Sequence, residues 1–361
     1  MIEQAIRVGT FANIPLRIHW TFVFIIIYII GTGLNDGNSY SEIIIQVCFT
    51  LSMFVCVVLH EFGHALTAKR YGIKTEDIIL LPIGGVARLE RFPEKAQQEL
   101  IIAIMGPLVN LVIAMTLFIG LFIYHGEHFA ELFDPSTFLN LSWVGFLPLL
   151  LIANILLMVF NMIPAFPMDG GRVLRALISM KTNRLVATKW ATRIGQFICF
   201  IFIGLGYYYN AWTTVFIGIF IFFSANSEYK HVVKEFALKN KTIGQFLRNI
   251  SNCFTDYQKL SDVKEIVIQS GINNFPVIDI TGQYIGSVNA SEIFKKIKSN
   301  TSLTIKDVMN DEVITLDKNE SLTMGVHYLE NVSPLIYVQE SHNIIGILDQ
   351  DSVNRGLQLG I

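Results

Sequence analysis

The chain has 361 residues, of which 52% are hydrophobic and only 16% are charged. Because soluble globular proteins carry about 25% charged residues, this composition predicts a membrane protein. The formal net charge of -2 argues against a nucleic-acid partner and against an acidic substrate. The four cysteines form no C-x-x-C pair, which favours small buried thiols over a disulfide or metal framework.

Apolar runs predict six transmembrane helices, with the first run retained as a helix and not removed as a signal peptide. The runs cover residues 18–33, 43–68, 99–124, 143–163, 190–209 and 211–226. A span needs about 20 apolar residues, so the last two runs are short, and the aromatic residues between them fit a hairpin at a membrane surface. Lys and Arg gather after the second and fourth runs and are absent after the first, third and fifth. The positive-inside rule therefore predicts a multi-pass protein of the plasma (inner) membrane with both termini in the cytoplasm.

The composition changes near residue 230, where Lys, Asp, Asn and Ser become frequent. We therefore expect a membrane domain at residues 1–230 and a soluble cytoplasmic domain at residues 231–361. The second domain contains a repeat with a period close to 60 residues, because Pro276-Val277-Ile278 recurs as Pro334-Leu335-Ile336. Helix-like stretches alternate with short β-branched runs in each half, which indicates α/β packing.

The second apolar run ends in a metal-binding pattern, His60-Glu61-Phe62-Gly63-His64. Histidines at i and i+4 lie on one face of a helix, as zinc ligation requires, and Glu61 beside them can act as a general base. Ionisable groups on a membrane helix are costly and are therefore functional candidates. The alternative is a set of polar residues that merely lie at a membrane surface.

The third zinc ligand must come from elsewhere in the chain, and Asp169 is the best candidate. Counted along its helix from the outer end, Asp169 reaches a membrane depth similar to that of His60. Proline residues break the helix before Asp169, and two glycines after it let the backbone turn. The alternative role is a helix cap, with Asp169 starting the next helix.

At this point the sequence resembles a known family. The pattern at residues 60–64, together with NMIPAFPMDGGR at residues 161–172, resembles the site-2 proteases, which are intramembrane metalloproteases. The resemblance covers nearly all of residues 15–230. It implies one Zn²⁺ per chain bound by His60, His64 and Asp169, with Glu61 activating water. It also implies cleavage of a membrane helix in a single-span protein, such as a membrane-anchored transcription regulator.

Two further features fit the same family. Residues 80–88 resemble a membrane-associated β segment, in which the backbone around Gly84 and Gly85 could pair with an unwound substrate strand. An ordinary Pro-Gly turn is the alternative. The resemblance makes Asn154 a candidate for holding the substrate carbonyl, although hydrogen bonding between helices explains it equally well.

The repeats at residues 242–299 and 303–358 resemble a tandem pair of CBS domains. The resemblance implies dimerisation, giving a homodimer through the pair, and binding of an adenine nucleotide. The places where the family often has Thr and Asp read Asn289 and Glu292 in one half and Asp349 and Ser352 in the other. An Asp349 carboxylate near a phosphate would be repulsive, so nucleotide binding and a purely structural or dimerising role both stay open.

Two other classes of protein compete with this interpretation. A CBS-gated channel explains six helices and the tail, but not the histidine motif or the broken helix before Asp169. A catalytically inactive membrane scaffold would normally have lost Glu61 or a ligand. His125 and His128 could form a second metal site, but a solvated loop is the favoured interpretation of this segment. The sequence thus predicts a polytopic α-helical membrane metalloprotease with a short β segment, followed by a soluble α/β CBS pair.

Overall fold

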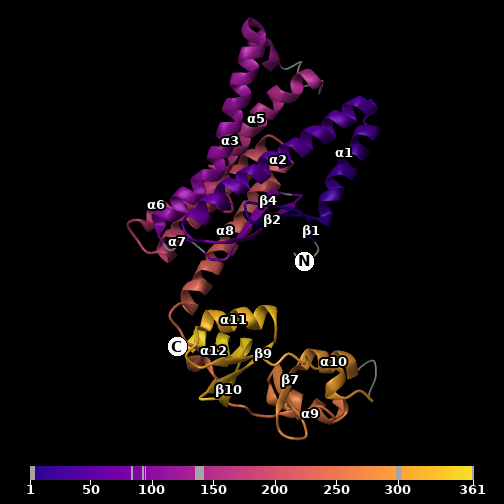
Figure 1. The fold of residues 1–361 in the computed structure, drawn as a ribbon, viewed down its shortest axis with the longest axis vertical. Helices are drawn as coiled ribbons and strands as arrows, with labels where there is room; N and C mark the ends of the chain where they lie inside the picture. The colour runs from indigo at the N-terminus through magenta and orange to yellow at the C-terminus, as the bar shows by residue number, and fades with distance from the viewer. Residues whose placement is uncertain are drawn as a thin grey trace. The chain divides into compact units, whose positions relative to one another are not determined.

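The computed structural model describes residues 5–82, 84–91, 93, 95–134, 142–297 and 302–359. The chain divides into two compact units, Met1–Val232 and Val233–Ile361. The first unit consists of long helices with one small sheet, and the second of small sheets with short helices (Figure 1).

Most helices of the N-terminal unit follow the apolar runs of the sequence, and one, α6, lies between two runs. They are α1 (Val23–Asn35), α2 (Tyr40–Arg70), α3 (Ala96–His125), α5 (Trp143–Asn161), α6 (Asp169–Ser179), α7 (Arg184–Tyr208) and α8 (Trp212–Leu238). Short 3-10 turns precede α1 (Trp20–Phe22) and follow α3 (Gly126–Phe133). The longest helix, α2, begins with a capping box in which Ser39 and Glu42 satisfy each other's backbone N–H groups.

Four segments of the described chain are long and apolar enough to cross a membrane. They are Tyr40–Arg70, Ala96–Phe133, Trp143–Asn161 and Arg184–Tyr208. The apolar helix Trp20–Asn35 is shorter, and α8 ends in a polar half that begins near Ser224. Four helices of the described chain could therefore span a membrane, and spans by the first and last predicted runs remain predictions.

A four-stranded sheet packs against the C-terminal half of α2. Its strands are β1 (Ala5–Phe11), β2 (Ile14–His19), β3 (Thr75–Leu81) and β4 (Gly84–Leu89), in the order β1-β2-β3-β4. β2 and β3 are parallel, the other two pairs are antiparallel, and β4 is an edge strand. Ile14, Ala65 and Ile78 form the buried contact between sheet and helix.

The predicted β segment at residues 80–88 corresponds to the end of β3 and most of β4, except for Ile83, which lies outside the described residues. Asp77 of β3 is 1% exposed and accepts two hydrogen bonds of 2.6 Å from Arg88 of β4. The hydrogen bond from Arg88 to Asp77 raises the pKa of the guanidinium. This fork-shaped ion pair, joined by Arg17 of β2 at 3.2 Å, fixes β4 beside its neighbours.

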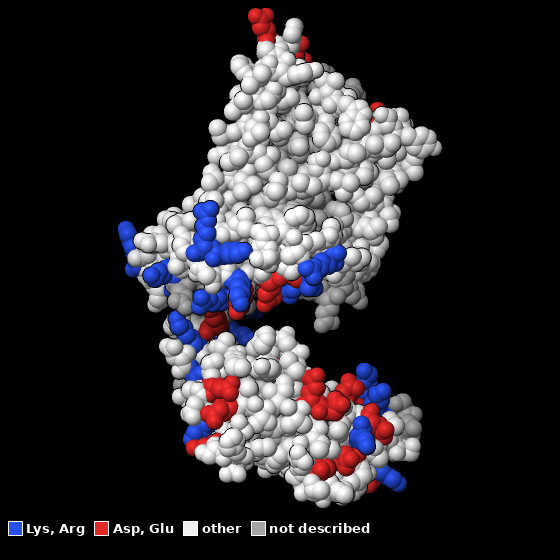
Figure 2. All heavy atoms as spheres, viewed as in Figure 1, with Lys and Arg blue, Asp and Glu red and all other residues white. Residues whose placement is uncertain are grey.

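Charged side chains are unevenly distributed over the N-terminal unit. On its visible face, Lys and Arg gather at the end where α6 and the sheet lie, and the described surface along most of the helices carries none (Figure 2). A band without charges is what a helical unit presents to lipid.

The C-terminal unit contains two similar halves. One has the sheet β5-β6-β7 and the other the sheet β10-β9-β8. The strands are β5 (Phe254–Thr255), β6 (Asn274–Ile278), β7 (Tyr284–Asn289), β8 (Thr315–Asp317), β9 (Leu335–Glu340) and β10 (Asn343–Asp349), and the helices are α9 (Leu260–Ser270), α10 (Ala290–Ile297), α11 (Leu322–Asn331) and α12 (Gln350–Leu359). The α/β packing expected from the sequence is confirmed, and the repeated Pro-Val-Ile segment lies in β6.

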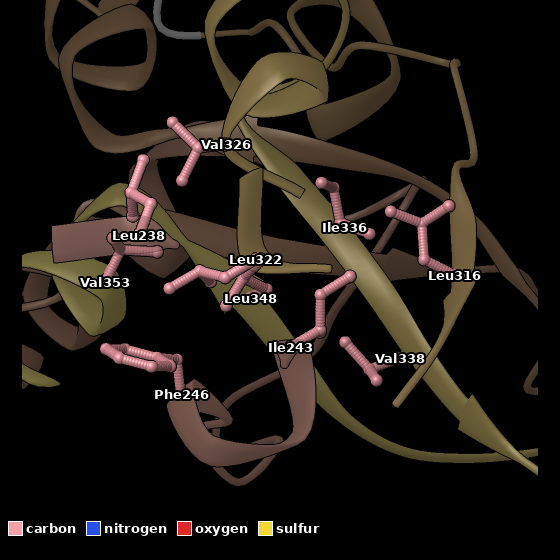
Figure 3. Packing of buried hydrophobic residues seen from close by; sticks show 10 residues of the cluster. All are labelled: Leu238, Ile243, Phe246, Leu316, Leu322, Val326, Ile336, Val338, Leu348 and Val353. Carbon is pink, nitrogen blue, oxygen red and sulfur yellow. The ribbon is translucent and has the colours of Figure 1, made fainter. Parts of the chain in front are cut away.

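The two halves exchange their first segments. Leu238, Ile243 and Phe246, which precede the first half, pack into the core of the second half (Figure 3). Ile305, which precedes the second half, is buried in the core of the first. Each core is therefore completed by residues from the other half, which ties the two halves into one folding unit.

Candidate metal centre

Three side chains from two distant segments meet inside the N-terminal unit. Nε2 of His60 and Nε2 of His64 lie 3.1 Å from each other, and each lies 3.1 Å from Oδ2 of Asp169. The histidines are one helical turn apart on α2, and Asp169 is the first residue of α6. All three are buried, and they form the one group among the described residues whose His, Cys, Asp or Glu atoms could jointly hold a metal ion.

The size of this triangle fits a tetrahedral zinc ion. Ligand atoms at about 2.0–2.1 Å from zinc, in tetrahedral directions, are about 3.3 Å apart. The three observed separations of 3.1 Å are close to this value. Two imidazoles and one carboxylate also form a donor set typical of catalytic zinc, which leaves the fourth position for water or substrate.

The other ring nitrogen of each histidine is hydrogen bonded to an acceptor. Nδ1 of His64 lies 2.7 Å from the carbonyl oxygen of Ile102, and Nδ1 of His60 lies 2.6 Å from Oδ1 of Asn110. A carbonyl oxygen can only accept, so Nδ1 carries the proton and Nε2 keeps its lone pair for a metal. Such outer partners orient metal-binding imidazoles and make them better ligands.

The partner of His60 belongs to a longer chain of hydrogen bonds. Nδ2 of Asn110 donates to Oδ1 of Asn154 at 3.0 Å, and Nδ2 of Asn154 donates to the carbonyl oxygen of Leu150 at 2.9 Å. Because the Leu150 carbonyl can only accept, the orientation of both amides follows from it. Both asparagines are 0% exposed, so this amide relay links α5 through α3 to His60 within the interior.

A glycine on α3 makes room for both imidazoles. A Cβ atom at Gly106 would lie 2.1 Å from Nε2 of His64 and 2.7 Å from Nε2 of His60. At Gly63, a Cβ would lie 2.7 Å from the carbonyl oxygen of Met105 on α3. Two glycines thus let α2 and α3 approach closely, and Gly106 leaves the space in front of the ligand atoms open.

The segment before α6 turns sharply and brings Asp169 to the histidines. α5 ends at Asn161, and α6 begins at Asp169 without a side-chain cap hydrogen bond. A Cβ at Gly170 would lie 2.3 Å from the carbonyl oxygen of Ile163 because the turn folds back over the start of α6. The Asp169 carboxylate is thus directed at the imidazoles and does not cap its own helix.

A buried ion cluster fixes the helix that carries Asp169. Arg175 of α6 is 1% exposed, and its Nε donates to Oε1 of Glu99 on α3 at 2.6 Å. Its NH1 group donates to Oε1 of Glu228 on α8, also at 2.6 Å. The guanidinium lies 5.0 Å from the centre of the Phe166 ring. These contacts hold α6 between α3 and α8 and thereby position Asp169.

The proposed base Glu61 faces the edge strand. Its Oε2 accepts a hydrogen bond of 3.2 Å from the backbone N–H of Ala87 in β4. A Cβ at Gly85 would lie 2.7 Å from Cγ of Glu61, so only glycine allows β4 to approach this closely. Gly84 has φ +137°, a backbone conformation that favours glycine. Of the two glycines that the sequence singled out, Gly85 therefore lies beside the candidate base, while a Cβ at Gly84 would meet nothing within 4 Å.

Sequence reasoning missed several members of the site. Gly106 was recognisable only as a small residue beside Pro107, and nothing in the linear sequence shows that it faces two imidazoles. The cluster of Glu99, Arg175 and Glu228 was also missed, although charges at the ends of apolar runs are a usable signal. The pair of His125 and His128 is not part of any metal-binding group among the described residues, and His128 pairs with Glu131 at 3.0 Å.

Comparison with known proteins gives consistent matches along the chain. A model of peptidase family M50 matches residues 48–137 and 125–205, and a model of the CBS domain matches residues 252–299 and 305–358. A zinc metalloprotease of Methanocaldococcus jannaschii is 29% identical over 358 residues, covering 99% of this chain and 97% of that protein. A putative zinc metalloprotease of Synechocystis is 27% identical over 390 residues, covering 99% and 96%. The solved structure of a site-2 protease from Methanocaldococcus jannaschii is 36% identical, covers 62% of this chain and 95% of that chain, and has a TM-score of 0.46.

Both relatives are named as zinc metalloproteases, one of them putatively, and the match covers nearly their full length. The chain belongs to peptidase family M50, the family of the site-2 proteases, and it carries a tandem pair of CBS domains in its C-terminal unit. Both family resemblances drawn from the sequence are confirmed. This membership favours the protease over the CBS-gated channel.

Proposed function

We propose that this protein is an intramembrane zinc metalloprotease that hydrolyses peptide bonds in transmembrane segments of single-span substrate proteins. The observation that supports this most strongly is the triangle of His60, His64 and Asp169 within helices of a membrane unit. We propose that these three residues hold one zinc ion and that Glu61 is the general base.

The chemistry divides between the ion and the chain. Zinc, when bound, polarises the scissile carbonyl and makes water nucleophilic at neutral pH. Glu61 takes a proton from the attacking water and delivers it to the leaving amine. The backbone N–H of Ala87 holds the Glu61 carboxylate in place through its hydrogen bond.

We propose that the edge of β4 binds the substrate as an added strand. A peptide bond within a helix is shielded by its own hydrogen bonds, so the substrate must unwind before attack. The edge strand β4, which begins with Gly84 and Gly85, offers backbone groups for such pairing, and Gly85 lets it approach Glu61 closely. Helix-breaking residues near the cut site should therefore help cleavage.

Asn154, the third candidate for substrate binding, is buried between helices, unlike Gly84 and Gly85 on the edge strand. Its amide is fully buried and engaged with Asn110 and the carbonyl of Leu150. Holding the substrate carbonyl would require an Nδ2 donor, and the Nδ2 group of Asn154 is already directed at the carbonyl oxygen of Leu150 and at Sγ of Cys56. The hydrogen bonds between helices therefore favour the alternative role of Asn154, which is support of the metal site through Asn110 and His60.

We propose a six-span topology in the plasma (inner) membrane, with both termini and the C-terminal unit in the cytoplasm. The gathering of Lys and Arg at one end of the N-terminal unit supports this orientation (Figure 2). The metal-ligand motif lies in the half of α2 that ends with Lys69 and Arg70. Water and metal would thus reach the site from the cytoplasm.

We propose that the CBS pair regulates the protease, with dimerisation and nucleotide binding as the two ways to do so. The carboxylate of Asp349 is 0% exposed and accepts a hydrogen bond of 2.8 Å from Nε of Arg248. Its charge is therefore compensated within the unit, which weakens the argument from repulsion of a phosphate. Calorimetric titration of the full chain with adenine nucleotides tests the second: measurable heat supports nucleotide binding, and its absence favours a purely structural or dimerising role.

Cleavage by the purified protein tests the activity. In detergent, with candidate single-span substrates, we expect cleavage that a zinc chelator abolishes. Glu61→Gln should retain zinc and lower the rate by about 10²–10⁴-fold or more, because it removes the proton acceptor. Asp169→Asn should lower the zinc content, because it replaces a ligand. Full cleavage by the Glu61 variant would remove the proposed base, and ion flux that is indifferent to Glu61 would support the channel.

A further inference from the structure

A polar cavity lies between α7 and α8 in the N-terminal unit. Its volume is about 220 Å³, and it is lined by Lys189, Thr192, Arg193, Gln196, Asn226 and Tyr229. The lining combines two cations with four neutral hydrogen-bonding side chains and contains no carboxylate. Within the described part of the chain, neither Lys189 nor Arg193 has an ion-pair partner. The cavity therefore offers positive charge that the protein itself does not neutralise.

The two cations share one face of α7. Lys189 and Arg193 are four residues apart, which makes them neighbours on a helix surface. The guanidinium of Arg193 lies 5.6 Å from the centre of the Trp190 ring, which restricts its direction. Thr192, between them, is 5% exposed and its hydroxyl reaches the carbonyl oxygen of Ala225 on α8 at 3.4 Å. The floor of the cavity is thus a packed contact between the two helices.

The depth of the cavity sets what surrounds it. Arg193 lies fourteen residues before Tyr207, and Asn226 lies fourteen residues after Trp212. Both are therefore about 21 Å along a helix from the aromatic hairpin that joins α7 to α8. The hydrocarbon core is about 30 Å thick, so straight helices would place these polar groups where acyl chains lie. Unsatisfied polar groups are costly there, and a polar lipid group that enters the cavity would satisfy them.

We propose that this cavity binds the phosphate-bearing headgroup of an anionic phospholipid. Lys189 and Arg193 pair with the phosphate, and Asn226 and Tyr229 donate hydrogen bonds to headgroup oxygens. The apolar surface next to the cavity on α7 includes Phe197, which is 66% exposed, and can hold an acyl chain. This adjoining apolar surface favours a lipid over a soluble phosphate.

A second cavity on α8 provides a contrast. It has a volume of about 270 Å³ and is lined by Ser224, Ser227, Glu228 and His231. Its carboxylate, Glu228, is paired with Arg175 at 2.6 Å. Its lining contains neither Lys nor Arg that could bind a phosphate. Of the two cavities, only the one between α7 and α8 therefore fits an anionic headgroup.

Lipid retention by the full chain tests the proposal. The protein is exchanged into mixed micelles of phosphatidylglycerol and phosphatidylcholine, and native mass spectrometry counts the lipids that remain bound. We expect one phosphatidylglycerol per chain for the unaltered protein. The double variant Lys189→Gln/Arg193→Gln should retain it at least about tenfold less, because both phosphate contacts are lost. Asn226→Leu, which keeps both cations, should cause a smaller loss.

The matched control is Lys181→Gln/Lys230→Gln, which removes the same charge from the same end of the unit outside the cavity. If both double variants lose the same amount of bound phosphatidylglycerol, the lipid is held by general attraction to positive charge, and the proposed site is wrong. Displacement of the lipid by an excess of inorganic phosphate would assign the cavity to a soluble phosphate and overturn the lipid. The proposal is supported if phosphatidylglycerol stays bound in excess phosphate and is lost from Lys189→Gln/Arg193→Gln but not from the control variant.

Discussion

The two units of this protein are stabilised by different contacts. In the C-terminal unit, two buried apolar clusters of ten residues each fill the space between sheets and helices. In the N-terminal unit, the buried apolar clusters contain only three or four residues. Lipid is as apolar as leucine, so membrane helices gain little by burying leucine against one another. Their packing depends instead on small residues and polar links, and the metal site uses both.

This difference means that single atoms matter more in the N-terminal unit. Glycines bring α2 and α3 together, and a relay of amides crosses three helices. In the C-terminal unit, the burial of apolar area is spread over many side chains. Substitutions that add or remove one polar or methyl group should therefore affect the first unit strongly and the second unit gradually.

The largest effect is expected from Gly106→Ala. The added Cβ would lie 2.1 Å from Nε2 of His64, so the imidazole must move or the two helices must separate. We expect the variant to contain almost no zinc by elemental analysis and to have no protease activity.

Gly120→Ala is the matched control, because Gly120 lies on the same helix and a Cβ added there would meet nothing within 4 Å. It should keep full zinc content. Full zinc content in the Gly106 variant as well would show that the close approach of α2 and α3 is not required.

The second effect concerns the buried ion cluster. Arg175→Met removes the cation between Glu99 and Glu228 and leaves one buried carboxylate, Glu99, and one half-buried carboxylate, Glu228, without it. Loss of one partner from a buried pair costs about 3–5 kcal/mol, so thermal unfolding of the protein in detergent should begin at a clearly lower temperature. Adding Glu99→Gln and Glu228→Gln should recover much of the loss. No recovery would mean that the packing of Arg175, and not its charge, stabilises α6.

A core substitution in the C-terminal unit tests the other half of the comparison. Leu322→Ala removes a side chain that is 0% exposed from the cluster in Figure 3, and should lower local stability by about 2–5 kcal/mol. Hydrogen exchange of the full chain should show faster exchange in β9 and β10, with zinc content unchanged. Leu359→Ala, at a position 78% exposed, is the control. Loss of zinc in the Leu322 variant would contradict the expectation that the core of the C-terminal unit can be weakened without affecting the metal site of the N-terminal unit.

The sequence predicted some of these features better than others, for physical reasons. The spacing of His60 and His64 places them on one helix face. The rise per residue of a helix places Asp169 at a similar depth in the membrane. The strands β1 and β2 were missed, because nearly all of residues 5–19 precede the first apolar run and β2 pairs with β3 only through the fold. Asn110 stands out in the sequence as a polar residue in an apolar helix, but its contact with His60, like that of Ile102 with His64, depends on how helices pack, which linear spacing does not encode.

The smallest effect, and the sharpest test of the polar packing, concerns Asn110. Asn110→Leu removes the acceptor for Nδ1 of His60, while Asn110→Asp keeps an acceptor oxygen at the same place. Loss of an outer partner of a metal-binding histidine typically lowers metal affinity by about 10–100-fold, so we expect that loss for the leucine variant in competition with a zinc chelator. The aspartate variant should bind zinc much more tightly than the leucine variant. Equal affinities in the two variants would mean that Asn110 only fills space, and that the relay to Asn154 and Leu150 does not orient His60.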